Sequence, residues 1–169
     1  LAARNIMVAA FPIDDPSGSD AAQNVDVKVS DFGLSKYGGR ERESPSTGET
    51  KCKDKEKIKD EEARPLRYMA PETFAVPPAF SEKSDVWAFG VLVWEVLDSC
   101  KTWAPYGDVT DDDALVTGVV SGTLKLSRPK KASKALWRIA QSCMQRDPEQ
   151  RPRFVDLAKT LEGLRATIQ

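Results

Sequence analysis

The chain has 169 residues, of which 40% are hydrophobic and 30% charged, so it is long enough for one ordinary domain with a sizeable core. Its formal net charge of -1 gives no overall attraction to nucleic acid or to an anionic membrane. It has no histidine and three cysteines without a C-x-x-C pair, which argues against a zinc site, a serine–histidine triad and a cysteine–histidine pair. Reduced thiols in an intracellular protein are the simplest interpretation.

No segment of the sequence is long and apolar enough to cross a membrane. The longest near-apolar run, residues 86–97, contains Glu95 and is shorter than the roughly 20 residues that a spanning helix needs. No signal peptide opens the chain, which starts at Leu1 inside an apparently structured segment. We therefore expect a fragment without a membrane segment of its own.

Two short strands are predicted near the start, at residues 6–9 and 25–29. The second strand alternates between valines on one face and polar residues on the other. The stretch between them is rich in turn-forming residues, especially over 12–20. This pattern predicts a β-hairpin with a long loop.

Nearly every residue from 40 to 64 is charged or small and polar, the apolar exceptions being Cys52, Ile58 and Ala63. Such a stretch cannot bury enough surface to offset the entropy lost on ordering. We therefore expect residues 40–64 to form a disordered insertion.

The rest of the chain has helical patterns. Residues 84–97 are apolar almost all round, which indicates a buried central helix. Thr-Asp-Asp-Asp at 110–113 resembles a capping box at the start of a second helix, which Gly122 can end. Apolar stripes at 136–144 and 154–164 predict two more helices. The fold class is thus mainly α, with a short β-hairpin followed by a bundle of about four main helices.

Three segments carry the functional signal. They are Leu-Ala-Ala-Arg-Asn at 1–5, Asp-Phe-Gly at 31–33 directly after a strand, and Tyr-Met-Ala-Pro-Glu at 68–72, followed by Ser-Asp-Val-Trp-Ala-Phe-Gly at 84–90. In this order the chain resembles the eukaryotic protein kinases, with their catalytic loop, D-F-G and A-P-E elements. Each motif alone is a weak signal, but together and in order they are a strong one. The resemblance covers nearly the entire chain.

The resemblance implies the helical C-terminal lobe of the protein kinase fold, an α+β fold, without its N-terminal lobe. Residues 1–169 are then a partial kinase domain that starts at the end of the catalytic loop. The activation segment is residues 31–72, and the helical lobe is residues 73–169. Residues 40–64 and 11–24 are insertions relative to the usual pattern.

Phosphoryl transfer from ATP needs metal ions to neutralise phosphate oxygens, and Mg²⁺ prefers oxygen ligands. By resemblance, Asp31 supplies a carboxylate to Mg²⁺ and Asn5 supplies an amide oxygen to a second metal ion. The cofactor site consists of Asn5, Asp31, Phe32 and Gly33, where Gly33 gives the backbone freedom to bring Asp31 inward. Taken alone, Asp-Phe-Gly has the alternative interpretation of an ordinary turn after a strand.

The catalytic base of the family is an aspartate directly before the residue that matches Leu1, and it is not in this sequence. The G-x-G-x-x-G loop and the phosphate-binding strand lysine of the family are not in the sequence either. We therefore expect no kinase activity from this chain alone. The resemblance implies two partners, the missing N-terminal kinase lobe and a protein substrate.

Ala2 and Arg4 bear on which residue accepts the phosphate. Serine/threonine kinases typically have a lysine at the position of Ala2, whereas tyrosine kinases typically show the Ala-Ala-Arg pattern found here. In that family the arginine lies near the phenol hydroxyl, so the resemblance makes Arg4 a catalytic residue beside Asn5. The alternative is a solvated surface arginine.

The substrate platform is expected at residues 65–68. Pro65, Leu66 and Arg67 resemble a tyrosine kinase, because serine/threonine kinases usually carry Gly-Thr where this chain has Arg-Pro. Tyr68 departs from the usual tryptophan and resembles the tyrosine-kinase-like serine/threonine group, which often reads R-Y-M-A-P-E. The platform therefore leaves two alternatives for the residue that accepts the phosphate, tyrosine first and serine or threonine second.

Further residues are expected to support the lobe. By resemblance, Glu72 pairs with Arg151 and ties the activation segment to the helices, and such a buried pair is costly to break from one side. Asp85 is expected to accept backbone donors from the catalytic loop. The four tryptophans, Trp87, Trp94, Trp103 and Trp137, are expected to pack in the core.

Tyr37 is a candidate phosphorylation site, because a phosphate there could order the charged loop through neighbouring lysines and arginines. The alternative is a solvated insertion without a switch. The leading interpretation is a signalling protein tyrosine kinase that works in the cytoplasm or on the cytoplasmic side of a membrane. The alternatives are a serine/threonine kinase of the tyrosine-kinase-like group, a non-catalytic kinase-fold binding module, and an unrelated helical domain.

Overall fold

The computed structural model describes residues 6–10, 26–30, 65–99, 101–102 and 104–168. The chain divides into two compact units, a hairpin unit and a helical unit. The predicted insertion at 40–64 lies outside the described residues, as does Trp103. Among the helices that the structure describes, none is long and apolar enough to span a membrane.

The hairpin unit contains β1 (Ile6–Ala10) and β2 (Asp26–Val29), which pair antiparallel as predicted. Ile6 lies opposite Val29, and the register shifts between Val8 and Ala10. Val27 and Val29 are 53% and 47% exposed, so the alternation seen in the sequence does not correspond to a buried face in this structure.

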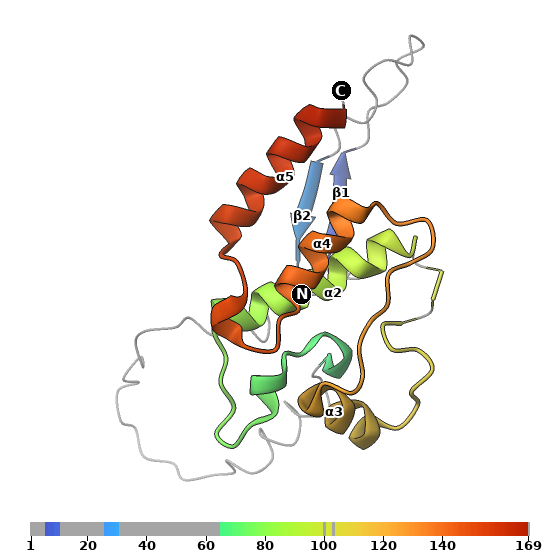
Figure 1. Cartoon of the computed structure of the whole chain (residues 1–169), viewed down its shortest axis with the longest axis vertical. Coiled ribbons are helices and arrows are strands. Elements are labelled where there is room, and N and C mark those ends of the chain that lie inside the picture. Colours follow the sequence, from blue (N-terminus) through green and yellow to red (C-terminus); the bar gives the residue numbers. More distant parts are fainter. Residues whose placement is uncertain (1–5, 11–25, 31–64, 100, 103, 169) are drawn as a thin grey trace, which may run out of the picture. The chain divides into compact units, whose positions relative to one another are not determined.

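Helix α2 (Glu82–Leu97) is the central helix of the helical unit, and it starts two residues before the predicted range (Figure 1). Its start is a capping box that the sequence analysis did not identify, in which Ser81 caps the first turn and the hydroxyl of Ser84 accepts from the backbone N–H of Ser81. Val86 and Val91 are fully buried, as the apolar pattern predicts. Val96, near the other end, is 63% exposed, so the helix is not buried all round.

Helix α3 (Asp112–Ser121) begins one residue later than the proposed cap requires. The capping residue is Asp111, whose carboxylate accepts from the backbone N–H of Ala114 at 2.6 Å. The expected capping box starting at Thr110 is therefore wrong, because the aspartate one position further on makes the capping bond. Gly122 ends the helix as predicted, with a left-handed φ of 77°.

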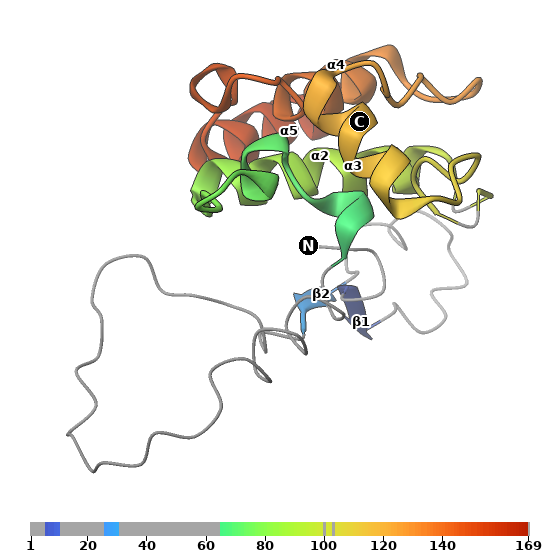
Figure 2. The ribbon, with the colours of Figure 1, turned by 90° about the horizontal axis from the view of Figure 1, so that it is seen from below.

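Helices α4 (Lys134–Cys143) and α5 (Phe154–Ile168) complete the set of four α-helices found in the described residues. Figure 2 shows α4 and α5 together on one side of α2. Helix α4 packs closely on α2 at Gly90, where an added Cβ would lie 2.7 Å from the Cβ of Cys143. Gly90 is therefore needed for the close approach of the two helices.

Two buried clusters form the core of the helical unit. One joins α2 to α3 and to the segment before it, through Trp87, Val91, Tyr106, Leu115 and Val119. The other joins α2, α4 and α5 through Val86, Ile139, Cys143 and Leu157. Trp87 and Trp94 are buried as predicted, whereas Trp137 is only partly buried.

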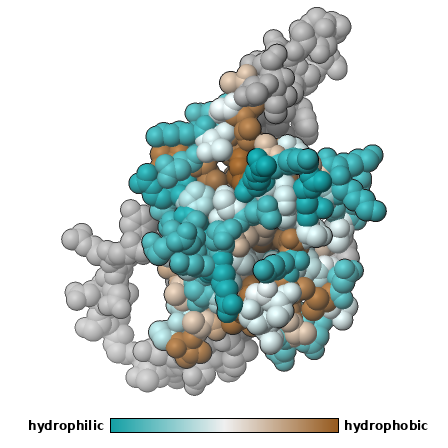
Figure 3. Space-filling model, viewed as in Figure 1, coloured by the Kyte–Doolittle hydropathy of each residue, from teal (hydrophilic) through white to brown (hydrophobic). Residues whose placement is uncertain are grey.

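The apolar stripe predicted for α5 is covered only in part. Leu157 is buried, but Ala158 is exposed and Phe154 and Val155 are 37% and 51% exposed. On the face shown in Figure 3, hydrophilic residues predominate and apolar residues form separate patches. Val76, at 98% exposure, is the most exposed large apolar residue among those the structure describes.

Candidate functional site

The predicted site falls into a part that the structure describes and a part that it does not. The residues proposed for catalysis, metal binding and phosphorylation lie outside the described residues; they are Arg4, Asn5, Asp31, Phe32, Gly33 and Tyr37. The described residues contain no acidic or cysteine cluster that could hold a metal ion. What the structure describes is the proposed substrate platform and its attachment to the helices.

Arg67 fixes the platform to the segment that precedes α3. It lies in the short 3-10 helix η2 (Leu66–Tyr68), and one terminal nitrogen of its guanidinium donates to the carbonyls of Pro105 and Tyr106 at 2.9 Å each. The other terminal nitrogen donates to the carbonyl of Val109 at 2.8 Å. A planar guanidinium with fixed donor directions suits such a role, since it holds three carbonyls in one geometry.

Tyr68 attaches the platform to α2. Its hydroxyl donates to a carboxylate oxygen of Glu95 at 3.0 Å, and both side chains are partly buried. The residue that departs from the tyrosine-kinase pattern thus has a specific structural partner. Tryptophan also carries a single N–H donor, so a tyrosine here keeps the ability to donate.

The expected ion pair between Glu72 and Arg151 is present. Glu72 lies in the 3-10 helix η3 (Pro71–Phe74), and its two oxygens accept from the two terminal nitrogens of Arg151 at 2.6 and 2.8 Å. Arg151 follows the 3-10 helix η4 (Pro148–Gln150), and the exposed fraction of its side chain is 0%. This is a bidentate, charge-assisted pair, the strongest arrangement available to an arginine and a carboxylate.

The remaining donors of Arg151 are used as well. Its Nε donates to the carbonyl of Gln145 at 2.7 Å, and its terminal nitrogens also donate to the carbonyls of Lys83 and Arg146. Its guanidinium carbon lies 5.1 Å from the ring centroid of Trp87. All five N–H groups of this arginine are therefore engaged, which offsets the cost of burying its charge.

Asp85 lies in the first turn of α2 and remains open to solvent. The protein around it nevertheless desolvates the carboxylate in part, and this raises the pKa of Asp85 above its usual value. The loop expected to donate to Asp85 lies outside the described residues, so its contact with that loop stays a prediction.

Sequence reasoning missed the partners of the platform. Glu95 is a charged residue within an apolar run, and this is the one signal in the sequence for its role. The carbonyls that Arg67 binds gave no signal, because backbone groups are the same for every residue type. Lys83, whose amine donates to the carbonyl of Arg151, is a further contact that was not foreseen.

Comparison with known proteins defines the class of this chain. Residues 1–161 match the family described as protein tyrosine and serine/threonine kinase. The chain therefore belongs to the protein tyrosine and serine/threonine kinase family, and its helices and hairpin are those of the C-terminal part of that fold.

Several relatives are tyrosine kinases by name. The chain is 39% identical over 142 residues to mouse cytoplasmic tyrosine-protein kinase BMX, covering 84% of this chain and 19% of that protein. It is 31% identical over 170 residues to mouse vascular endothelial growth factor receptor 1, covering 100% of this chain and 11% of the receptor. It is also 42% identical over 97 residues to chicken inactive tyrosine-protein kinase 7, covering 57% of this chain and 9% of that protein. The chain thus spans about a fifth or less of the length of these relatives.

Proposed function

We propose that the protein carrying this chain transfers the γ-phosphate of ATP to tyrosine side chains of protein substrates. The observation that carries the proposal is the ordered set of kinase motifs that begins with Ala-Ala-Arg-Asn at 2–5. The tyrosine kinases among the relatives support the same acceptor. A role in the cytoplasm, or on the cytoplasmic side of a membrane, goes with that activity.

Asn5 and Asp31 are the proposed metal ligands. Their amide and carboxylate oxygens are the donors that Mg²⁺ prefers, so this pair fits the metal that accompanies ATP in phosphoryl transfer. When bound, Mg²⁺ supplies neutralising charge for the phosphate oxygens. As in the kinase family, Phe32 and Gly33 are proposed to complete the cofactor site, and Arg4 is proposed to orient the acceptor hydroxyl.

Pro65, Leu66, Arg67 and Tyr68 are the proposed substrate platform. The three carbonyl bonds of Arg67 and the bond from Tyr68 to Glu95 hold η2 from two sides. A platform that is fixed before the substrate arrives lowers the entropy lost on binding, which favours productive alignment. We infer that these bonds set the shape of the shelf on which the acceptor side chain rests.

The test uses three peptides that differ only in having tyrosine, serine or threonine at the acceptor position. The full-length protein, with ATP and Mg²⁺, is expected to phosphorylate the tyrosine peptide at least about tenfold faster in kcat/KM than the other two. The variant Asp31→Asn should lose activity, because it removes the carboxylate that the metal needs, while Asp112→Asn on the exposed start of α3 should not. Equal activity of wild type and Asp31→Asn would refute the proposed metal site.

Serine/threonine transfer is the second candidate, and Tyr68 is the observation that favours it. The same peptide series distinguishes the two, since a faster serine or threonine reaction would show that the sequence at Tyr68 is the better guide to the acceptor than Arg4. The chain alone is expected to be inactive in either case. It contains no residue that matches the family's base, and the N-terminal lobe is its expected partner.

A non-catalytic binding module is the third candidate, favoured by the similarity to inactive tyrosine-protein kinase 7. This candidate predicts that ATP and Mg²⁺ leave the melting temperature of the full-length protein unchanged. The enzyme hypothesis predicts a rise that depends on ATP concentration, because a ligand that binds only the folded state stabilises it.

A further inference from the structure

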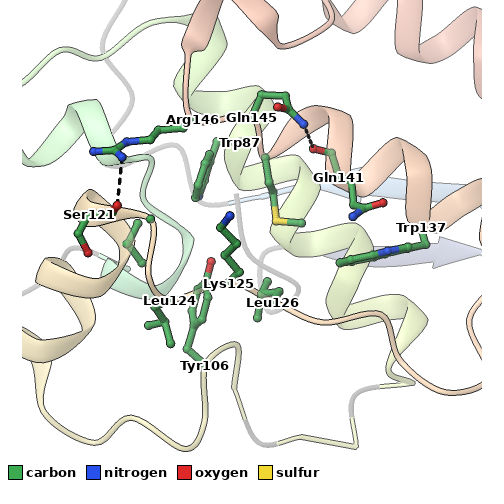
Figure 4. Close-up of a pocket in the computed structure, with 13 residues that line it drawn as sticks. Trp87, Tyr106, Ser121, Leu124, Lys125, Leu126, Trp137, Gln141, Gln145 and Arg146 are labelled. Carbon is green, nitrogen blue, oxygen red and sulfur yellow. Dashed lines mark hydrogen bonds between the residues drawn. The ribbon is translucent and has the colours of Figure 1, made fainter.

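The helical unit contains a pocket that the proposed kinase reaction does not use. It has a volume of about 460 Å³ and lies between α2, α3, α4 and the segment that joins α3 to α4 (Figure 4). Ligand sites in proteins usually measure about 300–1,000 Å³. The pocket is therefore large enough for a small organic molecule.

Two basic residues belong to the pocket lining, Arg146 at one side and Lys125 near the middle (Figure 4). The guanidinium of Arg146 donates to the carbonyl of Ser121 at 3.0 Å. Neither cation forms an ion pair with any residue that the structure describes, and the lining contains no aspartate or glutamate. The charges of Lys125 and Arg146 are thus available to bind an anion.

The side of the pocket away from Arg146 is largely apolar, with Gln141 as a polar neighbour of Trp137. Trp137, Leu126 and Met144 line this side, and each of them is partly buried. In Figure 4, Arg146 and Trp137 lie on opposite sides of the pocket, with Trp87, Lys125 and Tyr106 between them. A molecule with one charged end and a flat apolar body would match both sides.

Trp87 forms part of the wall between the two sides, and it carries a buried N–H without a hydrogen-bond acceptor among the described residues. Trp87 lines the pocket and is only 7% exposed, and its indole Nε1 has no hydrogen-bond partner in the described structure. Trp94, two turns further along the same helix, donates its Nε1 to the carbonyl of Ser127 at 2.8 Å. Buried donors are nearly always paired, so this N–H is unusual, but its nitrogen is closed off from the pocket and the indole contributes its apolar ring to the wall.

Tyr106 contributes a hydroxyl donor to this wall. A tyrosine hydroxyl is protonated at neutral pH, and burial raises the pKa of Tyr106 further above neutrality, to about 12. The lining therefore includes two cations, a phenol hydroxyl and the uncharged polar residues Ser121, Gln141 and Gln145, but no carboxylate. Such a set favours an oxygen anion over a cation or a neutral ligand.

We propose that this pocket binds a small organic carboxylate with a flat aromatic body. The carboxylate interacts with Lys125 and Arg146, and the aromatic body lies against Trp137, Leu126 and Met144. This site is separate from the proposed phosphoryl-transfer residues, and it stands whether or not the protein transfers phosphate.

The test uses 2-naphthoate as the probe and 2-naphthamide as its neutral control, which has almost the same shape. Titration calorimetry with the full-length protein is expected to give saturable binding of one 2-naphthoate, with the amide at least about tenfold weaker. In a ¹⁵N-labelled sample, the indole signal of Trp87 should shift on binding while that of Trp94 stays in place. Absence of binding, or equal affinity for the acid and the amide, would overturn the proposal.

A pair of lysine variants locates the site. Lys125→Met removes a cation from the pocket and is expected to weaken 2-naphthoate binding about tenfold. Lys131→Met removes another exposed lysine that does not line the pocket, and it should leave the affinity unchanged. Both changes are on the surface, so both proteins should fold. Equal affinities of wild type and Lys125→Met would show that the anion binds elsewhere, which refutes the assignment.

Discussion

Trp87 borders two regions that differ in how completely their polar groups are hydrogen-bonded. On one side is the junction of Glu72 with Arg151, where a buried guanidinium uses all five of its N–H groups. On the other is the pocket, where Lys125 and Arg146 have no acidic partner among the described residues and the Trp87 N–H is unpaired. The two regions share one indole ring.

The difference follows from burial. A charge that leaves water must be paired and fully hydrogen-bonded, or it costs several kcal/mol, so the junction has no donors to spare for a ligand. Lys125 and Arg146 stay exposed, so water solvates their charges at little cost when no anion is bound. The junction is therefore a structural feature and the pocket is a candidate binding site.

The largest effect is expected from breaking the junction on one side. Glu72→Ala leaves Arg151 buried without its carboxylate, which should lower the free energy of unfolding by about 3–5 kcal/mol. Urea unfolding followed by circular dichroism measures this. Asp156→Ala breaks the exposed pair of Asp156 with Arg153 and serves as the control, with no measurable change expected.

A double variant sharpens this prediction. Replacing both partners, as in Glu72→Met with Arg151→Met, removes the uncompensated charge, so its loss should be smaller than the sum of the two single losses. Additive losses, or a Glu72→Ala protein as stable as wild type, would mean that the ion pair does not hold the junction together.

A second prediction concerns the close contact of α2 with α4 at Gly90, next to the pocket. In Gly90→Ala the new Cβ would lie 2.7 Å from the Cβ of Cys143 and 2.8 Å from the Cγ of Met144, so α2 and α4 must move apart. The expected loss of stability is about 1–3 kcal/mol. Because Met144 lines the pocket, the binding of 2-naphthoate should weaken as well.

Gly163→Ala is the matched control for this change. Gly163 lies in α5, and its added Cβ would meet no atom within 4 Å. Alanine favours helix over glycine by up to about 1 kcal/mol, so this variant should be slightly more stable than wild type. If Gly90→Ala and Gly163→Ala both had the same free energy of unfolding as wild type, α2 and α4 would not be in close contact at Gly90.

A third prediction concerns the second attachment of the platform. Tyr68→Phe removes the hydroxyl that donates to Glu95 and should cost about 1 kcal/mol of stability. Tyr68→Trp restores a donor and should recover part of the loss if the indole N–H reaches Glu95. Thermal unfolding of the three proteins side by side measures both effects, and a Tyr68→Phe protein that melts with wild type would argue that the bond is not formed in solution.

The smallest effect is expected at Asp85, whose charge belongs neither to the Glu72–Arg151 junction nor to the pocket. Its folded-state pKa is raised, so the ionised form costs stability at neutral pH, and this cost disappears as the pH falls through that pKa toward 3.8 and below. Asp85→Asn should therefore be more stable than wild type near pH 7, with a gain that vanishes in acid. A gain of equal size at both pH values would show that desolvation of the charge is not the cause.

Local sequence patterns predicted the elements because those patterns are set by neighbours in the chain. The apolar run of α2, the glycine that ends α3 and the hairpin of β1 and β2 are all confirmed. The helix starts were less accurate. Ser81 and Asp111 cap α2 and α3, whereas the sequence pattern predicted a start at residue 84 for the first helix and a cap at Thr110 for the second.

The site was predictable only where a family pattern linked distant residues. Glu72 and Arg151 are 79 positions apart, and resemblance alone brought them together. The bonds from Arg67 to three carbonyls and from Tyr68 to Glu95 span 27 to 42 positions and depend on how the helices pack. The pocket has the same origin, since its cations come from the segment between α3 and α4 and from the segment after α4, which no periodicity connects.

The proposal that this chain belongs to a protein tyrosine kinase can be tested without choosing a substrate. The full-length protein and its Asp31→Asn variant are incubated with ATP, Mg²⁺ and a dephosphorylated mixture of cellular proteins, and new phosphorylation sites are identified by mass spectrometry. The account predicts new phosphotyrosines with the wild type and none with the variant. New sites confined to serine and threonine, or no difference between the two proteins, would contradict it.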